Sequence, residues 1–202
     1  MKTVLCFGDS NTYGYNPSNG RRYDKNTRWT GVLSTLLGEQ FNVIEAGCNN
    51  RTAFNDNPAG KNYTGTKAIN AYLTQNLDYI ILFIGINDLQ TQYNTEPTDF
   101  ISGLTKLIQP IKEKVPNAQI FLLAPPKTNP AIMKCFFKTL FDETVIEKSE
   151  KLPHIYKQIA TTHNCNFINL TEIISTSTKD GLHLEPSEHK TIAEAIYKTL
   201  NT

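Results

Sequence analysis

The chain has 202 residues, of which 39% are hydrophobic and 19% charged, and its formal net charge is +1. This length and composition are typical of one folded domain with an apolar core, and they exclude a disordered or fibrous chain. Lys and Arg are spread along the sequence, so the charge pattern favours a small or neutral partner over nucleic acid or an anionic membrane. We therefore treat residues 1–202 as a single domain.

The first residues do not resemble an export signal. The apolar run over residues 4–7 stops at Gly8-Asp9, whereas a signal peptide has a longer apolar region and a small-residue cleavage site. No later run approaches the roughly 20 apolar residues of a membrane span. The sequence therefore predicts a cytoplasmic protein. Its cysteines lack paired or metal-type spacing and are expected to be reduced thiols, with no metal and no cofactor: Cys6, Cys48, Cys135 and Cys165.

Short apolar runs alternate with segments of helical periodicity along the chain. Strands are predicted over residues 3–7, 41–46, 79–84, 119–124 and 166–169. Helices are predicted over residues 29–37, 66–77 and 98–114, within 142–162 with a break or kink near Pro153, and over 186–200. The helix over 98–114 has one apolar stripe at helical spacing, formed by Phe100, Ile101, Leu104, Leu107, Ile108 and Ile111.

Five strands alternating with helices predict an α/β fold with a parallel sheet covered on both faces. In such sheets, ligands bind beyond the carboxyl ends of the strands. Small and polar residues gather at these positions, with Ser10 after the first strand, Asn87 after the third, and an Asp180/His183 pair before the last helix. Each feature alone could be an ordinary turn. Together they supply the parts needed for acyl transfer.

These motifs carry a family resemblance. Gly8-Asp9-Ser10, Gly85-x-Asn87-Asp88 and Asp180-x-x-His183 resemble blocks I, III and V of the SGNH (GDSL-type) hydrolases, in the same order. The runs CFGDSNTYGY, RWTGVL and DGLHL are most similar to the bacterial arylesterase/acyltransferase branch of that family. The resemblance spans essentially the whole chain and implies a flavodoxin-like, three-layer α/β/α sandwich with a five-stranded parallel sheet.

The resemblance implies a serine esterase for small carboxylic esters that also transfers the acyl group to alcohols. Ser10 is expected to be the nucleophile, His183 the general base and acid, and Asp180 the residue that orients His183. The sequence departs from the family at Asn11, which stands where GDSL has leucine. This difference leaves the three expected catalytic residues unchanged.

Three groups are expected to bind the oxyanion: the backbone N–H of Ser10, the backbone N–H of Asn50, and the side-chain amide of Asn87. Gly47 is the alternative to Asn50, because many family members have a glycine in block II, although asparagine also tolerates unusual backbone angles. Asp9 is expected to fix the nucleophile turn. Supporting roles are expected for four residues: Asp9, Gly47, Gly85 and Asp88.

Aromatic residues flank both ends of the expected site. The aromatic residues near Ser10 either pack against the first helix or bind the substrate. Separately, the segment over residues 127–141 is expected to overhang the site, to form a subunit contact, or both. Its apolar side chains are Ile132, Met133, Cys135, Phe136, Phe137, Leu140 and Phe141. The predicted partners are accordingly a small ester substrate and further copies of this chain. The predicted pocket residues are Asn11, Tyr13, Tyr15, Trp29, Phe136 and Phe137.

Several alternatives stay open at the sequence level. Asparagines near the motifs favour sugar esters, which would make the protein a carbohydrate O-deacetylase, and thioesterase or lysophospholipase activity also suits the family. A flavodoxin-like phosphate- or flavin-binding protein is the alternative from another class, and a catalytically inactive family member is the third. Three histidines are expected to be structural or surface residues: His154, His163 and His189. The asparagines concerned are Asn11, Asn16, Asn49, Asn50, Asn55 and Asn57.

Overall fold

A computed structural model describes residues 1–73 and 76–200. Its centre is one sheet of five parallel strands in the order β2-β1-β3-β4-β5. The chain places β1 in the middle and β2 on one side of it, then builds β3, β4 and β5 on the other side. The strands are β1 (Lys2–Gly8), β2 (Phe41–Gly47), β3 (Tyr79–Phe83), β4 (Gln119–Ala124) and β5 (Asn166–Asn169).

The central strands are buried on both faces, and alternate side chains enter two separate cores. Leu5 and Phe7 of β1 belong to one core, and Val4 and Cys6 belong to the other. This period of two follows from the pleat, which points successive side chains to opposite faces of the sheet. Burial on both faces also explains why the strand sequences are almost continuously apolar.

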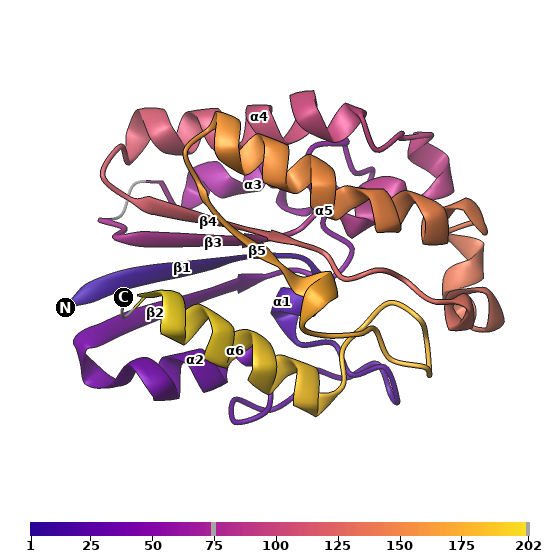
Figure 1. The fold of residues 1–202 in the computed structure, drawn as a ribbon, viewed down its shortest axis with the longest axis horizontal. Coiled ribbons are helices and arrows are strands. Elements are labelled where there is room, and N and C mark those ends of the chain that lie inside the picture. The colour runs from indigo at the N-terminus through magenta and orange to yellow at the C-terminus, as the bar shows by residue number, and fades with distance from the viewer. Residues whose placement is uncertain (74–75, 201–202) are drawn as a thin grey trace.

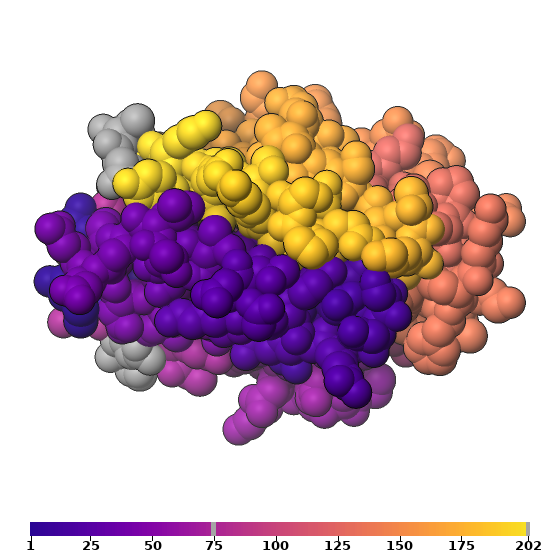
Figure 2. Space-filling model, turned by 90° about the horizontal axis from the view of Figure 1, so that it is seen from below, coloured from indigo at the N-terminus to yellow at the C-terminus, as the bar shows by residue number. Residues whose placement is uncertain are grey.

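Helices cover both faces of the sheet, as Figure 1 shows. The three-layer α/β/α sandwich with the flavodoxin-like strand order is therefore confirmed. Figure 2 views the α2 and α6 face, where the C-terminal helix lies beside the N-terminal part of the chain. On this face lie α2 (Trp29–Leu37) and α6 (Pro186–Leu200), and on the other lie α3 (Gly65–Ala68), α4 (Asp99–Lys114) and α5 (Thr144–Thr162).

Several local predictions differ from the structure. The helix predicted over 66–77 is replaced by α3 and a 3-10 helix (Ile69–Ala71), and residues 74–75 of that prediction lie outside the described residues. In α4, Ile101 is 39% exposed, because it lies about 100° round the helix from the buried Phe100. Of the break or kink predicted near Pro153, the break is wrong, since α5 continues through this residue.

Short helical elements were missed by the sequence analysis, because three to five residues give too little periodicity to detect. The most important is α1 (Ser10–Tyr13), which begins at the expected nucleophile. No helix within the described ranges combines the length and apolar character needed to cross a bilayer. The further 3-10 helices are Gly38–Gln40, Lys61–Tyr63, Ile86–Leu89, Thr91–Tyr93, Pro130–Lys134, Phe136–Thr139 and Leu170–Glu172.

The loop between α1 and α2 is tied to the sheet by Glu45 of β2. Its carboxylate accepts hydrogen bonds from Arg28 Nη2 (2.7 Å) at the end of the loop, from Thr30 Oγ1 (2.6 Å) in α2, and from Arg22 Nη2 (3.0 Å) within the loop. Burial alone would raise the pKa of Glu45, but the hydrogen bonds from Arg28 and Thr30 outweigh it and lower the pKa to about 2. This ionised carboxylate therefore holds a loop that, as described below, supplies one wall of a cavity.

We predict that Glu45→Gln lowers the free energy of unfolding at pH 7 by about 1–3 kcal/mol, the range for hydrogen bonds to a charged group. Because folding lowers the pKa of Glu45 from 4.5 to about 2, its contribution is present above pH 4.5 and is lost as the pH falls towards 2. Denaturant unfolding of parent and variant at several pH values measures this. Glu39→Gln, at an exposed position, is the matched control. A difference that stays constant down to pH 2 would contradict the prediction.

Candidate active site

The carboxyl ends of β1 and β3 bring the first two sequence motifs together. These strands are adjacent, and β1 is also paired with β2, so the chain leaves the sheet in opposite directions on either side of this point. A crevice at such a switch point is the usual ligand site of an open α/β sheet. Asp9 follows β1 and accepts the Asn11 N–H at 2.9 Å with Oδ1, which caps α1 and fixes the position of Ser10.

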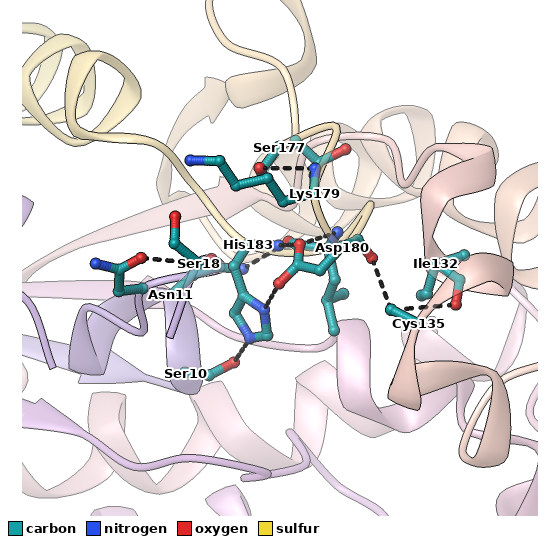
Figure 3. A network of polar contacts seen from close by, with 12 residues as sticks. Ser10, Asn11, Ser18, Ile132, Cys135, Ser177, Lys179, Asp180 and His183 are labelled. Carbon is teal, nitrogen blue, oxygen red and sulfur yellow. Dashed lines mark hydrogen bonds and ion pairs between the residues drawn. The ribbon is translucent and has the colours of Figure 1, made fainter. Parts of the chain in front are cut away.

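Ser10, His183 and Asp180 form a hydrogen-bonded row (Figure 3). His183 Nε2 is 2.9 Å from Ser10 Oγ, and His183 Nδ1 is 2.7 Å from Asp180 Oδ2. All three residues are buried, with no more than 5% of their surface exposed. The structure therefore brings together the three residues that the sequence predicted to act together. Ser10 and His183, which are in contact, are 173 residues apart along the chain.

Hydrogen bonds within the loop fix the position of Asp180 relative to His183. The second carboxylate oxygen, Asp180 Oδ1, accepts the N–H groups of Leu182 and His183, each at 3.0 Å. Burial would raise the pKa of Asp180, but the hydrogen bonds from His183 and Leu182 outweigh it and lower the pKa below its ordinary value. Asp180 is therefore ionised at neutral pH and favours the His183 tautomer with its proton on Nδ1.

Two aromatic rings flank the imidazole of His183. The Tyr15 ring centroid is 4.1 Å from that of His183 with 30° between the planes, and the Phe137 ring is 5.1 Å away. Tyr15 comes from the loop that Glu45 holds, and Phe137 comes from the 3-10 helix after β4. These contacts limit the rotation of the imidazole and cover it from water.

The row opens into a cavity of about 410 Å³. Its walls are mainly apolar, and polar groups gather at the base beside the serine. The predicted residues Tyr15, Phe136 and Phe137 contribute to the walls, so the segment over 127–141 does overhang the site. The cavity is lined by Ser10, Tyr15, Asn49, Asn50, Asn87, Phe136, Phe137, Leu140, Leu182 and His183.

The three expected oxyanion donors reach this cavity on Ser10, Asn50 and Asn87. Within the described part of the chain, neither the Ser10 N–H nor the Asn50 N–H has a hydrogen-bond acceptor. Asn50 has φ 62°, in the left-handed region that asparagine tolerates better than most residues. Asn87 Nδ2 donates to Arg51 O at 3.1 Å, which leaves its second hydrogen available.

The alternative donor Gly47 does not line the cavity. It ends β2, where a Cβ would collide with the backbone of Tyr13, so a glycine is required for α1 to pack closely on the sheet. Gly85 is required for a different reason, because its φ of 130° disfavours any other residue and a Cβ there would collide with the Tyr156 hydroxyl. Both glycines therefore shape the backbone around the site.

Two buried carboxyl groups support the site from below. Asp88 accepts the N–H groups of Ala53, Phe54 and Asn55, which follow the Asn50 turn, and burial raises its pKa to about 6. Burial raises the pKa of Asp9 to about 7, against the opposing effects of the Asn11 N–H and the Arg51 charge. Both residues thus position backbone segments and do not touch the cavity.

Three predicted pocket residues do not line the cavity. The Trp29 ring is fully buried in the core beneath α2 and α6, and its Nε1 donates to Asn11 O at 3.2 Å. Asn11 is also buried and donates from Nδ2 to Leu182 O at 3.4 Å. The ring of Tyr13 packs against the Arg22 guanidinium, 4.8 Å from its centroid. The prediction for these residues is wrong because α1 turns Asn11 and Tyr13 away from the cavity, while Trp29 begins α2 and packs into the core.

Some residues at the site were not among the predicted pocket residues. Asn49 and Leu182 line the cavity beside the predicted Asn50 and His183, and this position is the signal that could have indicated them. Leu140 lines it from within the segment over 127–141 that was expected to overhang the site. Arg51 is buried and donates from Nη1 to Gly8 O at 3.0 Å and to Ala46 O at 2.6 Å. It therefore joins the ends of β1 and β2, a role with no sequence pattern of its own.

The remaining histidines and cysteines lie away from the Ser10 row or beside it without joining it. His189 is buried on α6 and accepts the Trp29 N–H, His163 contacts Thr105, and His154 is exposed. All four cysteines are free, and Cys135 contacts Asp180 O. The described residues contain no group of three or more His, Cys, Asp or Glu side chains that could hold a metal ion.

Solved structures of two esterases are similar to this chain over its whole length. Est24, a carbohydrate acetylesterase from Sinorhizobium meliloti, is 29% identical in sequence, with a TM-score of 0.92 over 100% of this chain and 99% of that one. The inhibitor-bound aryl esterase of M. smegmatis is 28% identical, with a TM-score of 0.92 over 100% and 99% of the two chains. A comparison with curated protein sequences gave no match.

The model of the GDSL-like lipase/acylhydrolase family matches residues 6–190, which is most of the chain and includes every member of the Ser10 row. The expectation of a carboxylic ester hydrolase is thereby confirmed at the level of the family. The chain belongs to the GDSL-like lipase/acylhydrolase family.

Proposed function

We propose that this protein is a serine esterase for small carboxylic esters and that Ser10, His183 and Asp180 are its catalytic triad. The observation that carries the proposal is the buried row in which His183 contacts Ser10 Oγ at 2.9 Å and Asp180 at 2.7 Å, at the base of a cavity. A serine next to a histidine that is oriented by a carboxylate is the usual arrangement for activating a hydroxyl nucleophile.

In the first half-reaction, Ser10 Oγ attacks the ester carbonyl while His183 Nε2 takes the hydroxyl proton. Asp180 stabilises the imidazolium that forms and keeps its orientation. His183 then gives the proton to the departing alcohol, which leaves the acyl group on Ser10. In the second half-reaction, water or another alcohol gives a proton to His183 and attacks the acyl carbonyl. The bond between the acyl group and Ser10 Oγ breaks, and His183 returns the proton to Ser10 Oγ, so the protein acts as a hydrolase or as an acyltransferase.

The tetrahedral oxyanion is bound by the Ser10 N–H, the Asn50 N–H and Asn87 Nδ2. Two of these groups lack an acceptor within the described residues, and the third has one hydrogen to spare. Donors already fixed in place cost no reorganisation when charge develops in the transition state, and losing one donor typically reduces turnover by about 100- to 1000-fold. Asn50 supplies its N–H from a left-handed backbone conformation.

The walls of the cavity favour small esters with apolar or aromatic groups. Phe136, Phe137 and Leu140 face Tyr15 and Leu182 around it. Four of the six asparagines that favoured sugar esters do not line it: Asn11, Asn16, Asn55 and Asn57 bind backbone or neighbouring side chains instead. Asn49 and Asn50 are the asparagines left to contact a polar alcohol.

A sugar ester is the second candidate substrate, because Est24 is named a carbohydrate acetylesterase. A sugar needs several hydrogen-bond partners, and a buried polar group left without one costs about 1–3 kcal/mol. The apolar walls supply few such partners, so we place aryl and short alkyl esters first.

We predict that Ser10→Ala lowers the kcat for p-nitrophenyl acetate hydrolysis by roughly 1000-fold or more, since loss of the nucleophile removes the covalent route. Release of p-nitrophenol by the purified proteins measures this. Ser102→Ala, at an exposed position on α4, should keep the parent rate. If Ser10→Ala retained the parent rate, Ser10 would not be the nucleophile.

We predict that kcat/KM for phenyl acetate exceeds that for a monoacetylated glucose or xylose by about tenfold or more, which corresponds to one unsatisfied polar group in the cavity. Acetate release from both substrates under identical conditions measures the ratio. A ratio below one would contradict our ordering and identify the protein as a sugar-ester deacetylase, with the same Ser10 chemistry.

A further inference from the structure

Gln90 is buried behind the residues that line the cavity. It belongs to no sequence motif, so the sequence analysis gave it no role. It directly follows the 3-10 helix Ile86–Leu89, and its N–H donates to Asn87 O at 3.2 Å. Only 1% of its surface is exposed, and it does not line the cavity. A buried amide side chain must satisfy its own hydrogen-bonding groups within the protein, so its partners are fixed by the fold.

Both hydrogens of the Gln90 amide point to residues that we assign to the oxyanion site. Nε2 is 2.6 Å from Asn50 Oδ1 and 3.1 Å from Asn87 Oδ1. Arg51 O can only accept, so Asn87 must direct Nδ2 towards it and Oδ1 towards Gln90. This makes Gln90 Nε2 the donor and leaves Gln90 Oε1 to accept from Gln92 Nε2 at 2.9 Å. Asn50 therefore also directs its carbonyl oxygen towards Gln90.

The consequence for Asn87 is a defined polarity. With Oδ1 held by Gln90, Nδ2 is on the other side of the amide, where one hydrogen goes to Arg51 O at 3.1 Å. Rotating the amide by 180° would bring Nδ2 against the Gln90 donor and Oδ1 against the Arg51 carbonyl, and both contacts would be repulsive. Gln90 and Arg51 O therefore select the orientation in which Asn87 offers a donor.

Asn50 is held through the same group. Its backbone is in the left-handed region, which costs a non-glycine residue free energy unless other contacts compensate. The hydrogen bond from Gln90 to Asn50 Oδ1 is one such contact, and the bond from Asn57 Nδ2 to Asn50 O at 2.8 Å is another. Together they orient the Asn50 N–H, which has no acceptor within the described residues.

We propose that Gln90 is a positioning residue that holds two of the three oxyanion donors of this enzyme, the Asn87 amide and the Asn50 N–H, in their productive orientation. This inference rests on the proposed function, because it assigns a role in stabilising the oxyanion. Since the donors act on the transition state, loss of Gln90 lowers kcat more than it alters KM.

The test is Gln90→Met, which keeps the length of the side chain and removes both donors. We expect kcat for p-nitrophenyl acetate to fall by about 10- to 100-fold, less than for complete loss of a donor, with KM within about threefold. Gln109→Met is the matched control, because Gln109 is an exposed glutamine on α4 with a single amide hydrogen bond to Glu113, and it should keep the parent kcat. A parent-like kcat in folded Gln90→Met would overturn the proposal.

A double-mutant cycle separates positioning from a general structural effect. In an Asn87→Ala background, Gln90→Met should cost less than about fivefold, because the main group that it orients is already absent. The full loss repeated in that background would overturn the proposal. Thermal unfolding of each variant shows whether it is folded.

If Gln90→Met does not fold, Gln90→Glu replaces it as the test variant. Glutamate keeps the shape, but at this buried position it is protonated and can donate to only one of the two carbonyl oxygens that Gln90 holds, so kcat should again fall while KM changes little. A parent-like kcat in Gln90→Glu would overturn the proposal. Ser10→Ala separates a failure of the proposed function from a failure of the Gln90 proposal. If Ser10→Ala is fully active, the proposed function itself fails. If Ser10→Ala is inactive while the Gln90 variants keep the parent kcat, only the role of Gln90 is refuted.

Discussion

The Asp180 carboxylate is the group on which the geometry of the site depends. One of its oxygens accepts the Leu182 and His183 N–H groups and so determines the shape of the loop, while the other holds His183 Nδ1. The same side chain therefore sets both where the imidazole is and which tautomer it adopts. Its spacing of three residues from His183 makes this possible, because a turn of that length returns the carboxylate to the following N–H groups. Contacts from outside then hold the loop over Ser10, because Asn11 Nδ2 donates to Leu182 O and the Asn129 N–H donates to Gly181 O.

Much of what lies around this unit is polar and yet unavailable to a ligand. Asp88 binds three backbone N–H groups, Arg51 joins the ends of two strands, and Gln90 holds the two asparagines at the cavity. Buried polar groups must be satisfied, and here they are satisfied by one another. A count of polar residues near the motifs therefore overestimates the polarity of the cavity. This is why the asparagine-rich sequence favoured sugar esters while the cavity walls are largely apolar.

The sequence predicted the parts of the structure that depend on local pattern. Buried parallel strands are continuous apolar runs, so all five were found. The ends of two strands identified Ser10 and Asn87, and the motif before the last helix identified Asp180 and His183. The direction of a side chain on a four-residue helix is not a local pattern, so Asn11 and Tyr13 were misplaced. Gln90 was missed because its role depends on Asn50, which is 40 residues away and meets it through the crossing of two loops.

The site also contains the positions that cost the fold most. Asp9 is fully buried, and its Oδ2 has no hydrogen-bond partner within the described part of the chain, so burial raises its pKa to about 7. Because the folded-state pKa lies above the ordinary value of 3.8, ionising Asp9 weakens the fold as the pH rises through this range. Glu45 has the opposite shift and the opposite effect, and it is on the outer strand, away from the row. The left-handed Asn50 adds a second local cost. Asp9 and Asn50 thus lower stability near the Ser10 row, whereas Glu45 raises it elsewhere. This distribution is expected where the backbone conformation is maintained for catalysis and not for stability alone.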